Sequence, residues 1–144
     1  MTAELEERRL AVVREHMESE NAHDFDRTIA TFVRPRYELM ATGEIFDGEE
    51  EVRDYYARTR GDFPDQRNED SVLRSTRDGV FAEFDLLGTH ATLGTSFRSR
   101  MIAVFLFEDW GDRIVTERVY FDTASIREQL LPTGRTPVDE SLDR

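Results

Sequence analysis

The hydrophobic pattern of this chain changes near residue 63, and that change limits the folds it can adopt. Before it, apolar residues recur at helical spacing, and residues 4–20 place Leu5, Val13 and Met17 on one face of an amphipathic helix. After it, apolar and polar residues alternate, as they do in strands that are covered on one face. Helices followed by a run of neighbouring strands predict an α+β fold with a curved antiparallel sheet.

Two further helices, a short strand and a closing helical turn complete the predicted pattern. Asp24 is a candidate N-cap for the second helix, and Asp47, with Glu50 three residues later, is one for the third. The predicted segments are a helix through Phe25, Ile29 and Phe32, a strand over residues 37–42, a helix through Val52, Tyr55 and Tyr56, and a last turn through Ile126 and Leu130.

Longer strands are predicted in the second half of the chain, over residues 71–76, 80–87, 97–107 and 113–121. The pair Asp78-Gly79 is a hairpin-turn signal between the first two. A bent sheet whose concave face is covered by helices leaves a pocket near its mouth. Residues 1–131 are therefore predicted to form one domain around a pocket, and residues 132–144, which are polar, to form a loose tail.

Composition excludes several classes of function. The formal net charge of -12 would repel a phosphate backbone, so no nucleic-acid partner is expected. The chain has no cysteine and no pair of histidines at ligand spacing, so no metal site is expected. No stretch approaches the roughly 20 apolar residues of a membrane span, and the first residues lack a signal-peptide core. We expect a cytoplasmic protein with no membrane partner.

Six segments together resemble the SnoaL-like ester and polyketide cyclase group of the NTF2-like superfamily. They are Asn21–Asp24, Ala41–Gly48, Phe84–His90, Ala103–Glu108, Arg113–Asp122 and Arg127–Leu130. The most specific is the last strand, with its glutamate, aromatic and aspartate residues, followed by Gln129-Leu130. The resemblance implies a cone-shaped α+β barrel closed by the N-terminal helices, acid–base chemistry without a cofactor, and a homodimer.

The resemblance makes Asp122 the leading catalytic candidate, because characterised cyclases use an aspartate at the end of the last strand to shuttle a proton during aldol closure. Burial in an apolar pocket would give such a carboxyl a pKa near working pH. The strand before it lacks the histidine that these cyclases place beside the aspartate. Asp122 also directly precedes the last helix, so an alternative interpretation is an ordinary N-cap. His90 is the second catalytic candidate, as a proton relay at the pocket rim, or else an exposed loop histidine.

Candidate substrate-binding residues lie on the predicted strands and the third helix: Tyr37, Glu38, Tyr56, Phe105 and Tyr120. One of Tyr37 and Glu38 should point inward, because neighbours on a strand face opposite sides. Other NTF2-like enzymes, such as ketosteroid isomerases, keep a carboxylate base on this strand, so Glu38 is a candidate for that role or else an ordinary surface residue. His16 is expected to face the core or to be half-buried. Glu117 is expected on a salt-bridged or dimer-forming sheet face, and if buried it would need Arg98 or Arg100.

Two classes of function remain open. The first is a cofactor-independent acid–base enzyme acting on a small hydrophobic carbonyl compound, as a cyclase of the SnoaL type or an isomerase of the ketosteroid isomerase type. The second is a non-catalytic module of the same fold that binds a small ligand or forms a dimeric scaffold, since one fold hosts many functions.

Overall fold

The structure is a computed structural model, and it describes residues 1–132. The predicted tail falls almost entirely outside these residues. In chain order the elements are α1 (Ala3–Asn21), α2 (Phe25–Ala30), β1 (Arg36–Leu39), β2 (Glu44–Asp47), α3 (Glu49–Asp62), β3 (Arg67–Ser75), β4 (Gly79–Thr89), β5 (Ser96–Phe107), β6 (Ile114–Tyr120) and α4 (Thr123–Leu130). Within residues 1–132, no helix combines the length and apolar character needed to span a membrane.

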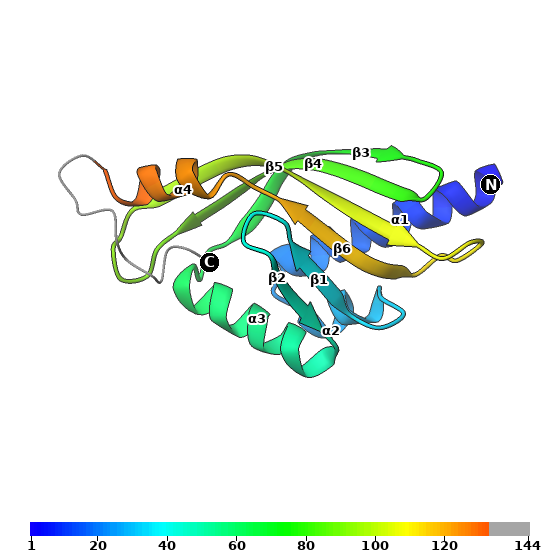
Figure 1. Cartoon of the computed structure of the whole chain (residues 1–144), viewed down its shortest axis with the longest axis horizontal. Helices are drawn as coiled ribbons and strands as arrows, with labels where there is room; N and C mark the ends of the chain where they lie inside the picture. Colours follow the sequence, from blue (N-terminus) through cyan, green and yellow to red (C-terminus); the bar gives the residue numbers. More distant parts are fainter. Residues whose placement is uncertain (133–144) are drawn as a thin grey trace.

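The strands form one curved sheet in the order β2-β1-β6-β5-β4-β3 (Figure 1). The predicted α+β class is confirmed, but the sheet is open, because β2 and β3 are its two edges and do not pair with each other. The sheet is also mixed: β1 runs parallel to β6, whereas the other neighbouring pairs are antiparallel. The parallel pair joins the start of the chain to its last strand and so brings distant residues together.

The helices cover the concave face of the sheet, and the core lies between the two layers. In Figure 1, α1 runs behind the sheet, α3 lies beside β1 and β2, and α4 lies at the opposite end from the N-terminus. The alternation predicted for β4 is confirmed, since Val80, Ala82 and Phe84 are all buried. They pack with residues of α1, α3 and β5 in a single main cluster. Burial of this apolar surface is the dominant favourable contribution to folding.

Three local features differ from the sequence-based expectations. Strand β2 was not predicted, and Asp47 ends this strand instead of capping α3. The N-cap of α3 is Gly48, with a φ of 93° that favours glycine. Its side-chain support comes from Glu51, whose carboxylate accepts the backbone N–H of Asp47 at 3.0 Å. Strand β3 begins at Arg67, four residues earlier than predicted, because a bulge after Glu69 lets it continue.

Candidate active site

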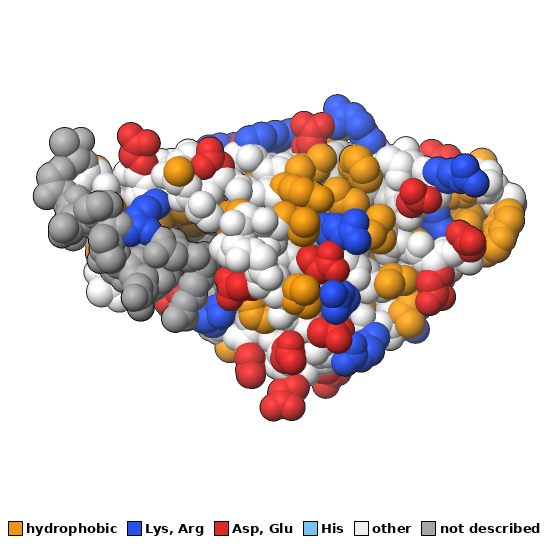
Figure 2. Space-filling model, in the orientation of Figure 1, with side chains coloured by type: hydrophobic (Ala, Val, Ile, Leu, Met, Phe, Trp, Pro, Cys, Tyr) orange, Lys and Arg blue, Asp and Glu red, His pale blue; other side chains and the backbone are white. Residues whose placement is uncertain are grey.

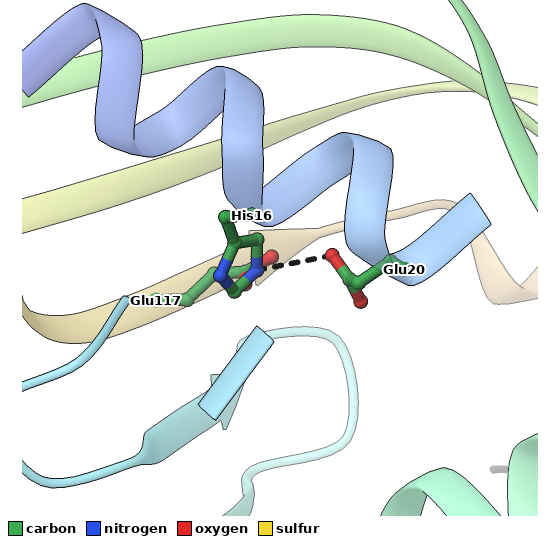
Figure 3. A group of neighbouring side chains, drawn as sticks. All are labelled: His16, Glu20 and Glu117. Carbon is green, nitrogen blue, oxygen red and sulfur yellow. Dashed lines mark ion pairs between the residues drawn. The ribbon is translucent and has the colours of Figure 1, made fainter. Parts of the chain in front are cut away.

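A group of buried titratable side chains lies between α1 and β6 (Figure 3). His16 and Glu20 are one turn apart on α1, so they share a face, and Glu117 points toward them from β6. His16 is fully buried and Glu117 is 4% exposed. We call these three residues the His–Glu group. Charged side chains this deeply buried are rare, and they cluster at functional sites.

Hydrogen bonding fixes the protonation of His16. The hydroxyl of Thr31 donates to the carbonyl oxygen of Thr28 at 2.6 Å, so its oxygen accepts a hydrogen bond from Nδ1 of His16 at 2.9 Å. Nδ1 therefore carries a proton, and Nε2 faces the two glutamates. Burial by itself lowers the pKa of His16, but the carboxylates of Glu20 and Glu117 outweigh it and raise that pKa to about 10. His16 is thus a cation at neutral pH.

The two glutamates share this cation unequally. Nε2 of His16 lies 2.7 Å from Oε1 of Glu117 and 3.0 Å from Oε1 of Glu20. The single N–H on Nε2 of His16 cannot point at both carboxylates. Oε1 of Glu117, although close to Nε2, has no aligned hydrogen-bond donor among the described residues. Glu20 has a second cation, since Nη2 of Arg60 lies 3.5 Å from its Oε2. Glu20 is therefore the better neutralised of the two carboxylates.

The pKa values of the two glutamates consequently move apart. Burial by itself raises both, but for Glu20 the charges of His16 and Arg60 outweigh burial and lower the pKa below its usual value. For Glu117, burial and the nearby charge of Glu20 outweigh the attraction of His16, and the pKa is raised. An ionised carboxylate next to a carboxyl whose pKa is raised suits general acid–base chemistry.

Two tyrosine hydroxyls extend the site from the His–Glu group toward α3. The hydroxyl of Tyr37 lies 3.3 Å from Nε2 of His16 and 2.6 Å from the hydroxyl of Tyr56. Burial raises the pKa of both tyrosines far above the usual value, so both stay protonated. Their mutual hydrogen bond uses one of the two hydrogens, and a protonated Nε2 accepts none. When Tyr56 donates to Tyr37, the hydrogen of Tyr37, which lines the inner cavity, is available to a ligand oxygen.

A cavity adjoins the His–Glu group. Its inner part, about 50 Å³, is lined by Glu117, Glu20, Tyr37 and Arg60, by apolar side chains, and by the polar residues Asn21, Gln66, Arg67 and Asn68. A second part of about 90 Å³ lies between α3 and α4 and is mainly apolar. The two parts have lining residues in common: Tyr55, Gln66, Leu86, Met101 and Val119. A small ligand in the apolar part therefore lies next to the acid–base group.

The His–Glu group also has the donor atoms of a cation site. One nitrogen of His16 and one oxygen from each glutamate lie within 4.8 Å of one another, and this is the only such group within residues 1–132. The guanidinium of Arg60 and the proton on Nε2 already balance the two carboxylates. A divalent cation would have to displace that proton and lie near Arg60. We therefore interpret the group as an acid–base site.

The structure places Asp122 outside this cavity. Asp122 is exposed, and its carboxylate accepts the backbone N–H of Ser125 at 3.0 Å as the N-cap of α4. The reason is strand parity: Glu117 and Val119 face inward, so Arg118 and Tyr120 face outward, and Asp122 follows on that side. The alternative interpretation, a helix cap, matches this position. Its geometry gives no support to the catalytic role predicted for Asp122.

His90, the second catalytic candidate, is also away from the cavity. It is buried, and its Nδ1 accepts the backbone N–H groups of Thr92 and Leu93 at 3.2 and 3.1 Å. These bonds hold the loop between β4 and β5 in place. The ring packs edge-on against Phe63. His90 is therefore neither an exposed loop residue nor a residue that lines the two cavity parts.

The predicted binding residues divide between the two faces of the sheet. Tyr37 and Phe105 line the inner cavity, and the hydroxyl of Tyr56 on α3 lies 2.6 Å from that of Tyr37. Glu38 and Tyr120 lie on the outer face, because they alternate with inward-facing neighbours. Partial burial by itself would raise the pKa of Glu38, but hydrogen bonds from Arg118 and Arg36 hold it below its usual value. Glu38 is therefore an ion-paired surface carboxylate.

The expectation for Glu117 also needs correction. Its partner is His16 and not Arg98 or Arg100, which lie on the outer face and pair with Asp85. His16 faces the core as expected, but its role, and those of Glu20 and Arg60, were not predicted from the sequence. The available signal was the four-residue spacing of His16 and Glu20 on the apolar side of α1.

An open curved sheet packed against helices, with a cavity at a buried acid–base group, defines an α+β protein of the ketosteroid isomerase-like fold class. The model of the SnoaL-like domain family matches residues 13–117, so the chain belongs to the SnoaL-like domain family. The matched range includes His16, Glu20 and Glu117 and ends before Asp122. The predicted family resemblance is confirmed. No curated protein matches the sequence at a significant level.

Solved structures with the same fold come from several bacteria. A protein of Jannaschia sp. CCS1, proposed to be a SnoaL-like polyketide cyclase, superposes with a TM-score of 0.79 at 15% identity, over 90% of this chain and 96% of that one. A protein of Xanthomonas campestris, proposed to be a polyketide cyclase, gives 0.77 at 18% identity over 88% and 98%. A hypothetical protein of Catenulispora acidiphila with a ketosteroid isomerase-like fold, in complex with trimethylamine, gives 0.75 at 20% identity over 88% and 97%. At these identities the similarity establishes the fold alone.

The protonation of His16 predicts how stability depends on pH. The pKa of His16 is about 10 in the folded chain against 6.5 for a free histidine, so its stabilisation is complete below pH 6.5 and is lost as pH rises toward 10. We expect the free energy of unfolding to fall across that range, and to fall less in His16→Gln. Urea unfolding of both proteins at several pH values measures this, and parallel curves would contradict the assignment.

The capping role of Asp122 predicts different outcomes for two substitutions. Asp122→Ala removes the acceptor for the Ser125 N–H and should destabilise the chain by about 1 kcal/mol. Asp122→Asn keeps an oxygen that accepts this N–H, so its stability should stay close to wild type. Urea unfolding at neutral pH compares the three proteins. Equal losses in both variants would show that the negative charge, and not the cap, matters.

Proposed function

We propose that this protein is a cofactor-independent acid–base enzyme that moves a proton next to the carbonyl of a small, largely apolar compound. The observation that carries the proposal is the pair of glutamates on one buried imidazolium, with their pKa values moved in opposite directions, beside a cavity. Membership of the SnoaL-like family and the fold shared with proteins proposed to be polyketide cyclases support it.

Each residue of the site has a role in this chemistry. The carboxylate of Glu117 removes the proton from the carbon next to the carbonyl, and the electron pair of the C–H bond moves into the carbonyl to give an enolate. A hydroxyl hydrogen of the Tyr37–Tyr56 pair hydrogen-bonds the enolate oxygen. His16 and Glu20 hold Glu117 in place and stabilise its charge. Where the enolate is conjugated to a C=C bond, return of the proton from Glu117 to the far carbon gives an isomer. Where the ligand carries a second carbonyl, attack of the enolate on its carbon closes a ring, and the proton on Glu117 passes to the alkoxide that forms.

The second candidate is a non-catalytic module that only binds a ligand in the cavity. The hydrogen bond between His16 and Thr31 favours this second candidate in part, because it holds a fully buried cation rigidly, and such a cation also stabilises a fold. A binding module does not need a proton-transferring group at Glu117, however. A neutral side chain at position 117 should therefore abolish proton transfer under the first candidate function and have no such effect under the second.

Exchange of a ketone's α-hydrogens with deuterated water tests the proposal. We expect the protein to accelerate α-exchange of acetophenone and of simple β-keto esters, and Glu117→Gln to lower the rate by about 10²- to 10⁴-fold, because a positioned base contributes that much. Proton NMR of the ketone measures the rate. Asp122→Asn is the matched control and should retain the wild-type rate. Equal rates in Glu117→Gln and wild type would reject Glu117 as the base.

We also propose that two copies of the chain pair through the outer face of the sheet. This face shows a group of apolar side chains with arginines and acidic residues around it (Figure 2). Phe81 and Tyr120 on this face are 38% and 41% exposed. Arg98, Arg100 and Asp85 also lie there, so the face carries both signs of charge and can match a second copy of itself.

Placing a charge in the middle of this face tests the dimer. Tyr120→Glu should weaken association about tenfold or more, because it buries an unpaired carboxylate in the contact. Sedimentation equilibrium over a range of concentrations measures the association constant. Glu4→Gln on the exposed side of α1 is the control and should associate like wild type. A wild-type chain that stays monomeric at every concentration would remove the proposal.

A further inference from the structure

The shape and lining of the cavity limit which compounds can reach Glu117. The part between α3 and α4 is lined by Phe97, Phe121, Ile126 and Leu130, and it measures about 90 Å³. The part beside the His–Glu group measures about 50 Å³. For scale, an engineered apolar cavity of about 150 Å³ holds one benzene molecule. The two parts together therefore have room for about one ring or a short chain.

The two parts also differ in polarity, and this difference sets the direction of a bound ligand. Glu20, Arg60 and Glu117 gather at the inner part, whereas the part between α3 and α4 takes Ile126 and Leu130 from α4. A carbonyl oxygen needs hydrogen-bond donors when it leaves water, and an apolar arm needs none. The carbonyl end therefore lies toward Glu117 and the arm lies under α4.

The helix that closes the apolar part is held firmly. Gln129 of α4 accepts the backbone N–H of Arg98 at 2.9 Å and donates to the carbonyl oxygen of the same residue at 3.1 Å. The hydroxyl of Thr95 donates to the carbonyl oxygen of Leu130 at 2.8 Å. These bonds tie both the side chain and the backbone of α4 to the strand β5 region. A larger ligand cannot gain room by moving α4 without breaking them.

From these observations we infer that the substrate is a carbonyl compound with a single apolar arm, one ring or a chain of similar size, and not a fused polycycle. The arm occupies the part between α3 and α4, and the carbonyl reaches the His–Glu group past Met101. This inference rests on the proposed acid–base function for the role of Glu117. The size limit itself is a property of binding and is measured without turnover.

The methyl signals of the four methionines report directly where a ligand binds. Met101 lines both parts of the cavity and Met17 lines the inner part, whereas Met40 and Met1 are 46% and 52% exposed. In protein labelled with ¹³C at the methionine methyl groups, acetophenone should shift the Met101 and Met17 signals and leave the other two in place. A shift of Met101 without Met17 would overturn the direction assigned to the ligand.

The series acetophenone, 2-acetylnaphthalene and 2-acetylanthracene tests the size limit. If apolar burial alone decided affinity, each larger ring system would bind more tightly. A size limit of the cavity would reverse that order of affinities. We expect the dissociation constant from the Met101 shift to be about tenfold lower for acetophenone than for 2-acetylnaphthalene, with no cavity binding of the anthracene. Binding of the fused ketones as tight as that of acetophenone, with the Met101 shift, would overturn the inference.

Two substitutions at Ile126 should change the size of ligand that the cavity accepts, one lowering it and the other raising it. Ile126→Trp fills the part under α4 and should weaken acetophenone binding about tenfold or more, whereas Ile126→Ala should let 2-acetylnaphthalene bind. Ala124→Trp places the same ring on the exposed side of α4 and is the matched control. Unchanged binding in both Ile126 variants would place the ligand elsewhere. Cooperative urea unfolding of each variant confirms that it is folded.

The exchange assay separates this inference from the proposed function. Acetophenone that binds at Met101 without α-exchange would reject the acid–base role of Glu117 and leave the size limit intact. α-Exchange of the fused ketones as fast as that of acetophenone would reject the size limit and leave the acid–base role intact.

Discussion

The proton that His16 holds between the buried Glu117 and the half-buried Glu20 is the interaction on which the rest of this structure depends. Taking charges out of water costs several kcal/mol per ion, and only close partners of opposite sign recover it. Here the partners come from α1 and β6, and Arg60 of α3 supplies the second positive charge. Displacement of any of these elements would leave an unpaired charge in the core, so the group fixes how helices and sheet pack together.

The His–Glu group lacks one hydrogen bond, and this missing bond makes a carboxyl of the group more ready to take up a proton. Oε1 of Glu117 is buried without an aligned donor, although most buried polar atoms in proteins have one. The surrounding apolar core tolerates this cost because it is large and continuous. A carboxyl in such a place takes up a proton more readily than one in water, and the neighbouring cation keeps its anionic form accessible.

Much of the fold follows from local sequence patterns, whereas the site follows from long-range packing. The alternation along β4 and the helical spacing in α1 are properties of short segments, and both were predictable. Strand β2 was missed because it has only four residues and ends at Asp47, and Asp47 followed by Gly48 is equally typical of the start of a helix. Asp122 was misplaced because position near the end of a strand does not tell which face the residue occupies. The parity that settles it is set by Glu117, and only the fold shows that Glu117 meets His16.

Family membership and the cavity constrain function at different levels. Many activities share this fold, so family membership does not identify the compound that enters the cavity. What the cavity accepts depends on the side chains that line it, among them Ile126 and Leu130 of α4. In the function that we propose, a base held between α1 and β6, instead of an aspartate at the end of the last strand, sets which atom of a ligand is within reach. Under that proposal the chemistry depends on how deeply a ligand enters, because Glu20, Arg60 and Glu117 come together only at the inner part of the cavity.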